Sequence, residues 1–331
     1  MRWFKKIVAI ISILLIIYLL GPKPSTPVYN INLPSIPENS AALLNYIQTN
    51  ESAHKIKPDN EARIIWNNDS LKEKTEYAIV YLHGFSASQE EGNPVHKNIA
   101  KQFGCNLYLY RLSQHGIDTT DELQNLTADN YWESAKTAYT IGKQLGDKVI
   151  LMGTSTGASL ALQLAATYPD IAGLILISPN IEINDPNAWV LNNHWGLQIA
   201  RMVLKSKYRD ITNKPNDYKK YWNTHYRLES AVALEELLET TMNKTTFAKV
   251  TQPTLTLYYY KDAQHQDNVV KVGAIEKMFN ELATPANEKR LIAVPNAENH
   301  VLCSPIQSKD IITPQKEIAA FLKEVIKLPV Q

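Results

Sequence analysis

Hydrophobic residues along this chain gather in short runs that are separated by longer stretches of mixed polarity. Seven runs predict β-strands, at residues 62–66, 77–85, 105–112, 148–153, 172–179, 254–260 and 289–295. Most are continuous rather than alternating, as in strands covered on both faces. Helical patterns lie at residues 40–54, 94–103, 127–145, 157–168, 269–282 and 313–327. This alternation predicts an α/β protein, with a mostly parallel central sheet and helices on both faces.

One long stretch, residues 181–250, interrupts the alternation because it contains no clear strand pattern. It holds Trp189, Trp195 and Trp222, which are half of the six tryptophans of the protein. An insertion of this length is usually functional. We expect a helical cap over the carboxyl edge of the sheet. The alternative is a helical subdomain whose aromatic residues form only its own core.

The amino terminus combines the basic segment MRWFKK with an unbroken apolar run at residues 7–20. A helix from Trp3, with Lys5 and Lys6 reaching toward the lipid surface, is about 27 Å long and spans a locally thinned bilayer. Residues 1–20 therefore predict a membrane anchor or a signal segment. An uncleaved transmembrane signal-anchor through residues 3–20 is favoured over a signal peptide, because no small-x-small cleavage site follows the run. Basic residues before it place the remainder on the non-cytoplasmic side, periplasmic or extracellular.

Five prolines in residues 21–38 predict an extended linker, and residues 39–331 are then the main domain, with the cap at about 181–250. The 34 basic and 33 acidic residues are spread along the chain, which argues against a nucleic-acid partner. The two cysteines, Cys105 and Cys303, lie in no metal-ligand spacing. Whether they pair, and whether the protein forms oligomers, stays open at this point.

The sequence GTSTG, residues 153–157, joins the strand pattern at 148–152 to an apolar helical pattern. A serine at a tight strand-to-helix turn is a typical nucleophile, and small residues at Gly153 and Gly157 let the backbone approach itself there. The pentapeptide alone is weak evidence. Its position after a strand and before a helix makes Ser155 the candidate nucleophile.

A serine hydroxyl needs a base, and the base needs an orienting acid, in the chain order Ser, Asp or Glu, His. His300 follows the last predicted strand and is the candidate base. Two aspartates after the preceding strand compete for the role of the acid. Asp267 is favoured because it opens an apolar helical pattern, DNVV, whereas Asp262 lies nearer to the end of the strand.

Stabilising the oxyanion requires two N–H donors that point to one place. The residue after the nucleophile, Thr156, is expected to supply one backbone N–H. The loop after the strand at 77–85 is expected to supply the other, from Phe85. The preceding pair His83-Gly84 can also be read as a simple turn, but its combination with the downstream GTSTG favours the functional interpretation.

Together, YLHGF, YRLSQHGID, GTSTG, DNVV and ENHVL resemble, in order, motifs of the α/β-hydrolase superfamily, and in particular its monoglyceride-lipase-like and esterase-like members. The resemblance covers roughly 270 residues from about residue 60. It implies a catalytic triad of Ser155, Asp267 and His300, and a cap between the sixth and seventh core strands. The chain also resembles a bacterial group of hydrolases with an amino-terminal membrane anchor. The turn that carries the triad acid, which we call the acid turn, is longer than usual for the family. For this reason Asp262 stays open as the alternative to Asp267.

The expected function is that of a serine hydrolase which cleaves carboxylic esters, of a lipid or a small molecule, with no metal or organic cofactor. An acyltransferase or a peptidase with the same triad is the alternative within enzymes. A catalytically inactive, membrane-tethered binding protein is the alternative from another class.

Overall fold

Seven strands form one sheet at the centre of the computed structural model, which describes residues 2–331. Its order is β1-β3-β2-β4-β5-β8-β9, and every neighbouring pair is parallel except β1 with β3. All seven predicted strands are therefore confirmed. Their bounds are β1 (Arg63–Ile65), β2 (Thr75–Leu82), β3 (Asn106–Leu109), β4 (Gly146–Thr154), β5 (Gly173–Ile177), β8 (Thr254–Tyr258) and β9 (Lys289–Ala293).

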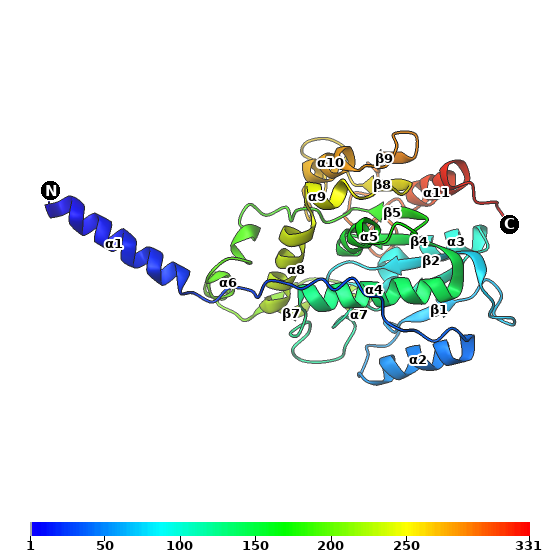
Figure 1. Cartoon of the computed structure of the whole chain (residues 1–331), viewed down its shortest axis with the longest axis horizontal. Coiled ribbons are helices and arrows are strands. Elements are labelled where there is room, and N and C mark those ends of the chain that lie inside the picture. The colour runs from blue at the N-terminus through cyan, green and yellow to red at the C-terminus, as the bar shows by residue number, and fades with distance from the viewer. Residues whose placement is uncertain (1) are drawn as a thin grey trace.

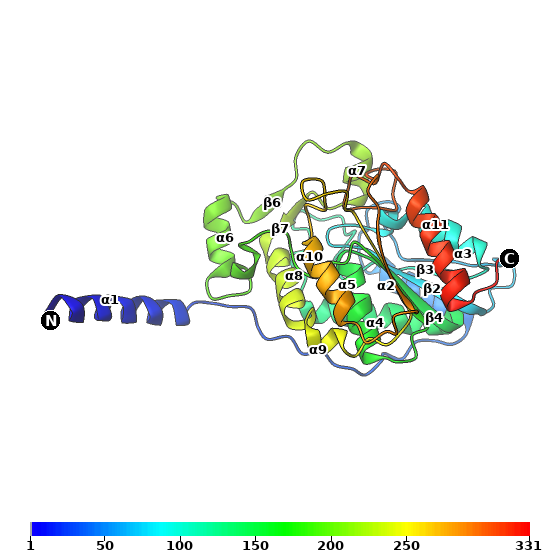
Figure 2. The same ribbon diagram turned by 90° about the horizontal axis from the view of Figure 1, so that it is seen from above.

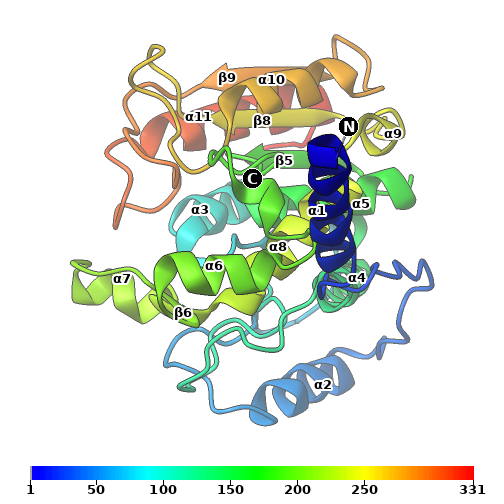
Figure 3. The same ribbon diagram turned by 90° about the vertical axis from the view of Figure 1, so that its left-hand side faces the viewer.

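Helices cover both faces of this sheet, as the continuous apolar runs predict. Val80 and Leu82 of β2 belong to the core on the face of α4 (Ala128–Leu145) and α5 (Thr156–Thr167). Ile79 and Tyr81 belong to the core on the opposite face, that of α3 (Val95–Gln102) and α11 (Ile312–Phe321) (Figures 1 and 3). The body of the molecule outside the long insertion also contains α2 (Ser40–Ser52), the 3₁₀-helix η1 (Gln89–Gly92), α10 (Val272–Glu281) and the π-helical turn η3 (Leu322–Ile326).

The insertion lies between β5 and β8, which are the fifth and sixth strands of the sheet along the chain. This is one position earlier than the resemblance implies, because the sheet has seven strands in all. It is mostly helical, but it also contains a two-stranded sheet that the sequence pattern did not reveal. Its elements are η2 (Ala188–Val190), α6 (Gly196–Leu204), β6 (Tyr208–Asp210), α7 (Asn216–Tyr221), β7 (His225–Arg227), α8 (Leu228–Thr241) and α9 (Lys244–Phe247).

Helix α1 (Arg2–Leu19) extends away from the body of the molecule (Figure 1). The prediction that it anchors the protein in a membrane is wrong, because no helix within residues 2–331 is both long and apolar enough for a crossing. Arg2, Lys5 and Lys6 occupy its first turns, and the apolar part that follows is about 20 Å long, short of the ~30 Å hydrocarbon core. The predicted location on the non-cytoplasmic side rested on this anchor and is withdrawn with it.

Residues 21–38 form an extended segment that runs along the surface of α4 (Figure 1). The indole Nε1–H of Trp132 donates to the carbonyl of Asn30 at 2.6 Å, and Lys136 Nζ donates to the carbonyl of Asn32 at 2.8 Å. Residues 21–38 are extended, as their proline content predicts. We call them the strap, because side chains of α4 hold them against the body.

Candidate active site

Ser155 lies between the last residue of β4 and the first residue of α5, at φ 54° and ψ −119°. This positive φ is costly for a residue with a side chain, and such strain is typical of functional turns. A Cβ atom added to Gly157 would collide with the carbonyl oxygen of Leu82, and one added to Gly153 would collide with Gly157. The Ser155 N–H donates to the carbonyl of Ile177 at 2.8 Å. The two glycines therefore permit the close approach that holds Ser155 in this strained turn.

His300 and Asp267 form a buried hydrogen-bonded pair at the same edge of the sheet. The Nδ1–H of His300 donates to Asp267 Oδ2 at 2.6 Å. The other carboxylate oxygen of Asp267 accepts the N–H groups of Val269 and Val270, at 2.8 and 3.1 Å. Asp267 is thereby fixed by the chain that follows it. Because Nδ1 of His300 carries the hydrogen bond, Nε2 is the ring nitrogen left to act as a base.

The charges of this pair stabilise each other. Burial disfavours a carboxylate, but the charge and hydrogen bond of His300, with two backbone N–H groups, hold the pKa of Asp267 below its usual range. Burial likewise disfavours a charged imidazolium, yet Asp267, with a smaller contribution from Glu91, raises the pKa of His300 above its ordinary value. The imidazolium that forms during general-base catalysis is therefore favoured at this site.

Asp262, the competing aspartate, lies elsewhere. Its carboxylate accepts hydrogen bonds from the backbone of Gln264 and His265 and lies 2.8 Å from Nδ1 of His265. The side chains of Asp262 and His265 are both exposed to solvent. The structure brings Asp267, and not Asp262, to His300.

Ser178, which the sequence reasoning did not single out, connects the serine and the histidine through the end of β5. Its Oγ donates to the carbonyl of His300 at 2.7 Å. It directly follows Ile177, the residue whose carbonyl accepts the Ser155 N–H. Ser178 is buried, at a positive φ of 43°. A serine after a strand carries no distinguishing signal in one sequence, which is why it was missed.

The loop after β2 lies against Ser155. In it, the amide of Phe85 differs from the two amides beside it in its hydrogen bonding. The Gly84 N–H donates to Glu91 Oε2 at 2.6 Å, and the Ser86 N–H donates to His115 Nε2 at 3.1 Å. No hydrogen bond from the amide of Phe85, between them, is found in the described part of the chain. A Cβ on Gly84 would lie 3.1 Å from the Cβ of Ser155.

Thr156, the second expected oxyanion donor, begins helix α5. Its N–H is one of the first amides of the helix, which have no partner within the helix itself. The positive end of the helix dipole also lies at this point and favours negative charge. The geometry is therefore compatible with both predicted donors, Phe85 and Thr156.

Two buried histidines hold the loop after β2 to the loop after β3. His83 donates from Nδ1 to the carbonyl of Gly84 and accepts the Leu112 N–H at Nε2, at 2.9 and 3.0 Å. His115 donates from Nδ1 to Ser113, which leaves Nε2 to accept the Ser86 N–H. Burial lowers the pKa of His83 to about 4 and that of His115 well below its ordinary value. Both rings are neutral at pH 7, in the tautomers that these bonds require.

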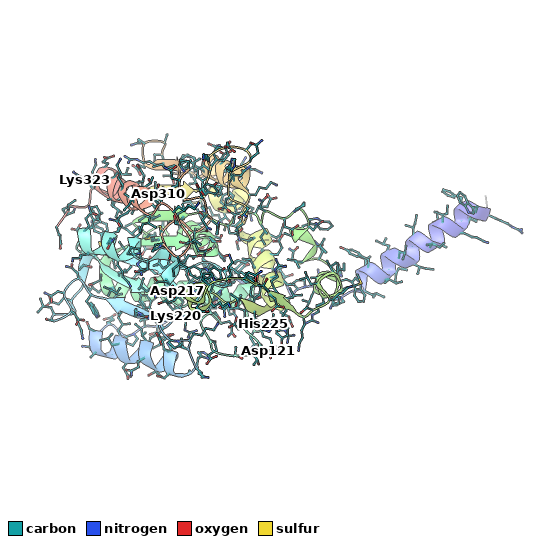
Figure 4. The ribbon with its side chains drawn as sticks, turned by 180° about the vertical axis from the view of Figure 1, so that it is seen from behind. Asp121, Asp217, Lys220, His225, Asp310 and Lys323 are labelled. Carbon is teal, nitrogen blue, oxygen red and sulfur yellow. The ribbon has the colours of Figure 1, made fainter. Side chains whose placement is uncertain are left out.

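Two aromatic side chains of the insertion pack beside the candidate site. Tyr218 and Trp222 pack against Ala87, from the loop after β2, and Val301, which follows His300. Ser155 and His300 are accordingly only 6% and 8% exposed. The insertion is also tied to the segment before α4, because Arg227 of β7 forms an ion pair of 2.8 Å with Asp121. Figure 4 labels Asp121 and, from the insertion, Asp217, Lys220 and His225.

Two other hollows lie away from the serine. One of about 380 Å³ is bounded by α2, β3 and α4, and one of about 460 Å³ by α8, α9 and α10. Neither is lined by Ser155, Asp267 or His300. Residues 2–331 contain no cluster of three or more His, Cys, Asp or Glu side chains placed to hold a metal ion. Cys105 and Cys303 are separate buried thiols.

Solved structures of lipolytic enzymes share this fold. A structure from a study of the metagenome-derived lipolytic enzymes LipS and LipT superposes with a TM-score of 0.63 at 18% identity, over 82% of this chain and 100% of the other. The monoacylglycerol lipase of Paleococcus ferrophilus gives 0.56 at 14%, over 81% and 98%. A soluble variant of monoglyceride lipase from Saccharomyces cerevisiae gives 0.57 at 12%, over 82% and 91%. At these identities the likeness establishes the fold.

The fold, together with a family match over residues 73–302, defines a serine hydrolase of the α/β-hydrolase class, similar to lipases and esterases. A thermostable monoacylglycerol lipase from Bacillus sp. (strain H-257) is 30% identical over 105 residues, which are 32% of this chain and 41% of that protein. The match thus spans less than half the length of that relative. Residues 73–302 match the hydrolase family described as serine aminopeptidase, S33, and the chain belongs to this family.

Proposed function

We propose that this protein hydrolyses carboxylic esters, of a lipid or a small molecule, through an acyl-enzyme on Ser155. The observation that carries the proposal is the buried His300–Asp267 hydrogen bond of 2.6 Å, held through Ser178 to the strand end that also binds the Ser155 backbone. An ordered nucleophile, base and acid on this edge of a parallel sheet is the arrangement that acyl transfer requires.

In the first half of the reaction, Ser155 Oγ attacks the ester carbonyl carbon while His300 Nε2 accepts the hydroxyl proton. The carbonyl oxygen becomes an oxyanion, which accepts hydrogen bonds from the amides of Phe85 and Thr156. The tetrahedral intermediate then collapses, and His300 returns the proton to the departing alcohol. Asp267 keeps Nε2 directed at the serine and stabilises the imidazolium.

In the second half, a water molecule replaces the alcohol. His300 removes one of its protons as the water oxygen attacks the acyl carbon. The second tetrahedral intermediate breaks its bond to Ser155 Oγ, which recovers the proton from His300. The carboxylic acid leaves, and no external reductant, oxidant or metal enters the balance.

In this proposal the insertion at residues 181–250 is the cap of a hydrolase domain that comprises residues 39–331. The packing of Tyr218 and Trp222 on both loops that border Ser155 supports this role. The substrate must therefore enter past aromatic side chains, which favours esters with an apolar acyl chain or an aryl group. The lipase names of the relatives point in the same direction.

The test is labelling of the full-length protein with a fluorophosphonate, together with hydrolysis of p-nitrophenyl esters from acetate to palmitate. We expect labelling and turnover in the wild-type protein, and loss of both in Ser155→Ala. The acyl length with the highest kcat/KM then measures the acyl pocket. A wild-type protein that neither labels nor turns over any ester would contradict the proposal and favour an inactive binding protein.

Amide and transfer substrates separate the remaining alternatives. The family description names an aminopeptidase, so aminoacyl p-nitroanilides belong in the same assay. Labelling of Ser155 with turnover of anilides, and none of esters, would replace the esterase proposal by a peptidase. Ester turnover that yields a new ester with an added alcohol, in preference to the free acid, would indicate an acyltransferase.

A further inference from the structure

Glu91, in η1, is a buried carboxyl group next to the candidate active site that the proposed reaction does not use. It is 3% exposed, and Glu side chains are almost never this deeply buried without a charged partner. No lysine or arginine pairs with it anywhere in residues 2–331. Its Oε2 accepts the Gly84 N–H at 2.6 Å. An unpaired buried carboxyl is costly, which indicates that it serves a local purpose.

The surroundings of Glu91 join three parts of the site. Its carboxyl oxygens lie 3.0 Å from the position of a Cβ on Gly84, and that same position lies 3.1 Å from the Cβ of Ser155. The indole of Trp222, from the insertion, faces the carboxyl and lowers its pKa, which favours the charged form. The other titratable groups that interact with it are Tyr81 of β2, Tyr131 of α4, Tyr218 of α7, and His300 and Cys303 of the loop at residues 294–311 after β9, which we call the histidine loop.

We propose that Glu91 is a positioning residue of the hydrolytic site, which holds the Gly84 amide so that the next amide, that of Phe85, is presented to the oxyanion. This inference rests on the proposed function. The held amide of Ser86 on the other side completes the arrangement, because the Phe85 N–H, between two amides that are held, is left to turn to a ligand. Fixing a donor before the substrate arrives is what makes oxyanion stabilisation effective.

The same carboxyl also acts on the base by its charge. Burial raises the pKa of Glu91 to about 7, even though Gly84, His300 and Trp222 all favour the charged form. The negative charge contributes, after Asp267, to the raised pKa of His300. Neutralising Glu91 therefore has a definite sign: the pKa of His300 falls, and the base stays deprotonated at lower pH.

Two variants separate these effects. Glu91→Gln keeps an oxygen acceptor for the Gly84 N–H and removes the charge, whereas Glu91→Met keeps the length and removes the acceptor. Glu90→Gln is the matched control, because the Glu90 carboxylate accepts from Asn93 Nδ2 at 2.8 Å and has no contact in the site. Each rate is divided by the number of sites that a fluorophosphonate labels, so that misfolded molecules do not count.

We expect kcat per labelled site to fall about 100-fold in Glu91→Met with little change in KM, because a misplaced donor is felt only in the transition state. Glu91→Gln should recover most of this loss and move the acid limb of kcat/KM to lower pH. NMR titration of the His300 imidazole should show a lower pKa in Glu91→Gln than in the wild-type protein. Glu90→Gln should resemble the wild-type protein in every respect.

Other outcomes overturn the inference. Glu91→Met with a normal kcat per labelled site, and only a smaller labelled fraction or a lower melting temperature, would make Glu91 a purely structural residue. An unchanged acid limb and unchanged His300 titration in Glu91→Gln would remove the electrostatic role. If the wild-type protein is active and both Glu91 variants match its rate, the ester-hydrolase proposal stands and the proposed role of Glu91 is wrong. A wild-type protein that fails to label removes both.

Discussion

At Ser155 the strained backbone is possible because Gly153 and Gly157, two residues away on either side, lack side chains. We predict that Gly157→Ala lowers the free energy of unfolding by about 3 kcal/mol, because its Cβ meets the carbonyl of Leu82, a backbone atom that cannot rotate away. The measurement is a urea titration. Gly273 of α10 is the matched control, since a Cβ there meets nothing within 4 Å. Gly273→Ala should stabilise the protein by about 0.5–1 kcal/mol. Equal effects at both glycines would contradict the argument.

The two aspartates of the acid turn give a second comparison at the scale of single residues. Asp267→Asn should lower kcat by about 10⁴-fold, because an amide in that place favours the tautomer of His300 that turns a proton toward Ser155. Asp262→Asn should stay within about twofold of the wild-type rate, as expected of an exposed side chain paired with His265. Steady-state ester hydrolysis measures both. A larger loss for Asp262→Asn would exchange the two roles.

At the scale of elements, the loops after β2 and β3 behave as one unit because two neutral histidines join them. The rings of His83 and His115 lie 4.9 Å apart, and each ring donates to a carbonyl of its own loop and accepts a backbone N–H from the other loop. A proton added to either ring would remove an acceptor that holds a backbone N–H. A fall in pH should therefore loosen the loop after β2 before it unfolds the sheet.

His83→Gln tests this at the level of stability. The folded-state pKa of His83 is about 4, below the ordinary value of 6.5, so the neutral ring stabilises the fold fully above about pH 6.5 and loses that contribution as the pH falls toward 4. The amount is about 3 kcal/mol. Glutamine can make both hydrogen bonds without titrating. Urea midpoints at pH 7.5 and 4.5 should show a smaller acid loss in His83→Gln than in the wild-type protein, and identical losses would refute the role.

The helices and strands that position the site could be predicted from one sequence because they are long or fully buried. All five residues of β5 are buried, which is why its apolar run is continuous. The elements that escaped prediction, β6 and β7, have three residues each, too few for any periodicity to appear. Membrane insertion was predicted wrongly because the apolar run at residues 7–20 is close to, but below, the length that a crossing needs.

Within the candidate site, the residues with family-like motifs could be predicted and their supports could not. Ser155, Asp267 and His300 each follow a strand in a recognisable order. Glu91 lies in the polar run QEEG, where nothing separates it from the part-exposed Glu90 beside it. Its burial depends on how β2, the histidine loop and Trp222 meet, and that meeting is a property of the fold and not of local sequence.

At the scale of the whole molecule, the strap joins the amino terminus to the body through side chains of α4 and α5. Lys136 is only 1% exposed, and its ammonium group is bound to the strap carbonyl of Asn32. Tyr168 OH donates to Ile31 in the same way, at 2.7 Å. At its other end the strap meets the insertion, where His194 Nδ1 donates to Gly21 at 2.7 Å (Figure 2). The proposed domain boundary at residue 39 would remove all of these contacts.

Two truncations test the contribution of the strap. A chain that begins at residue 21 should unfold within about 0.5 kcal/mol of the full chain, because the side chains of α1 are not buried in the body. A chain that begins at residue 39 should lose about 4 kcal/mol, from the four hydrogen bonds that the strap carbonyls accept, at about 1 kcal/mol each. Urea unfolding at pH 7.5 measures both. Equal stability of the two truncated chains would show that the strap only rests on the surface.

The strap contacts also have a consequence for the order of events during synthesis. Asn30 and Asn32 are made about 100 residues before their partners on α4, with separations of 102 and 104 in the chain. At roughly 5–20 residues per second, the ribosome takes about 5–20 s to reach those partners. Throughout this interval the strap has no surface to bind. Its prolines, which disfavour both helix and sheet ladders, keep it extended and unpaired until α4 emerges.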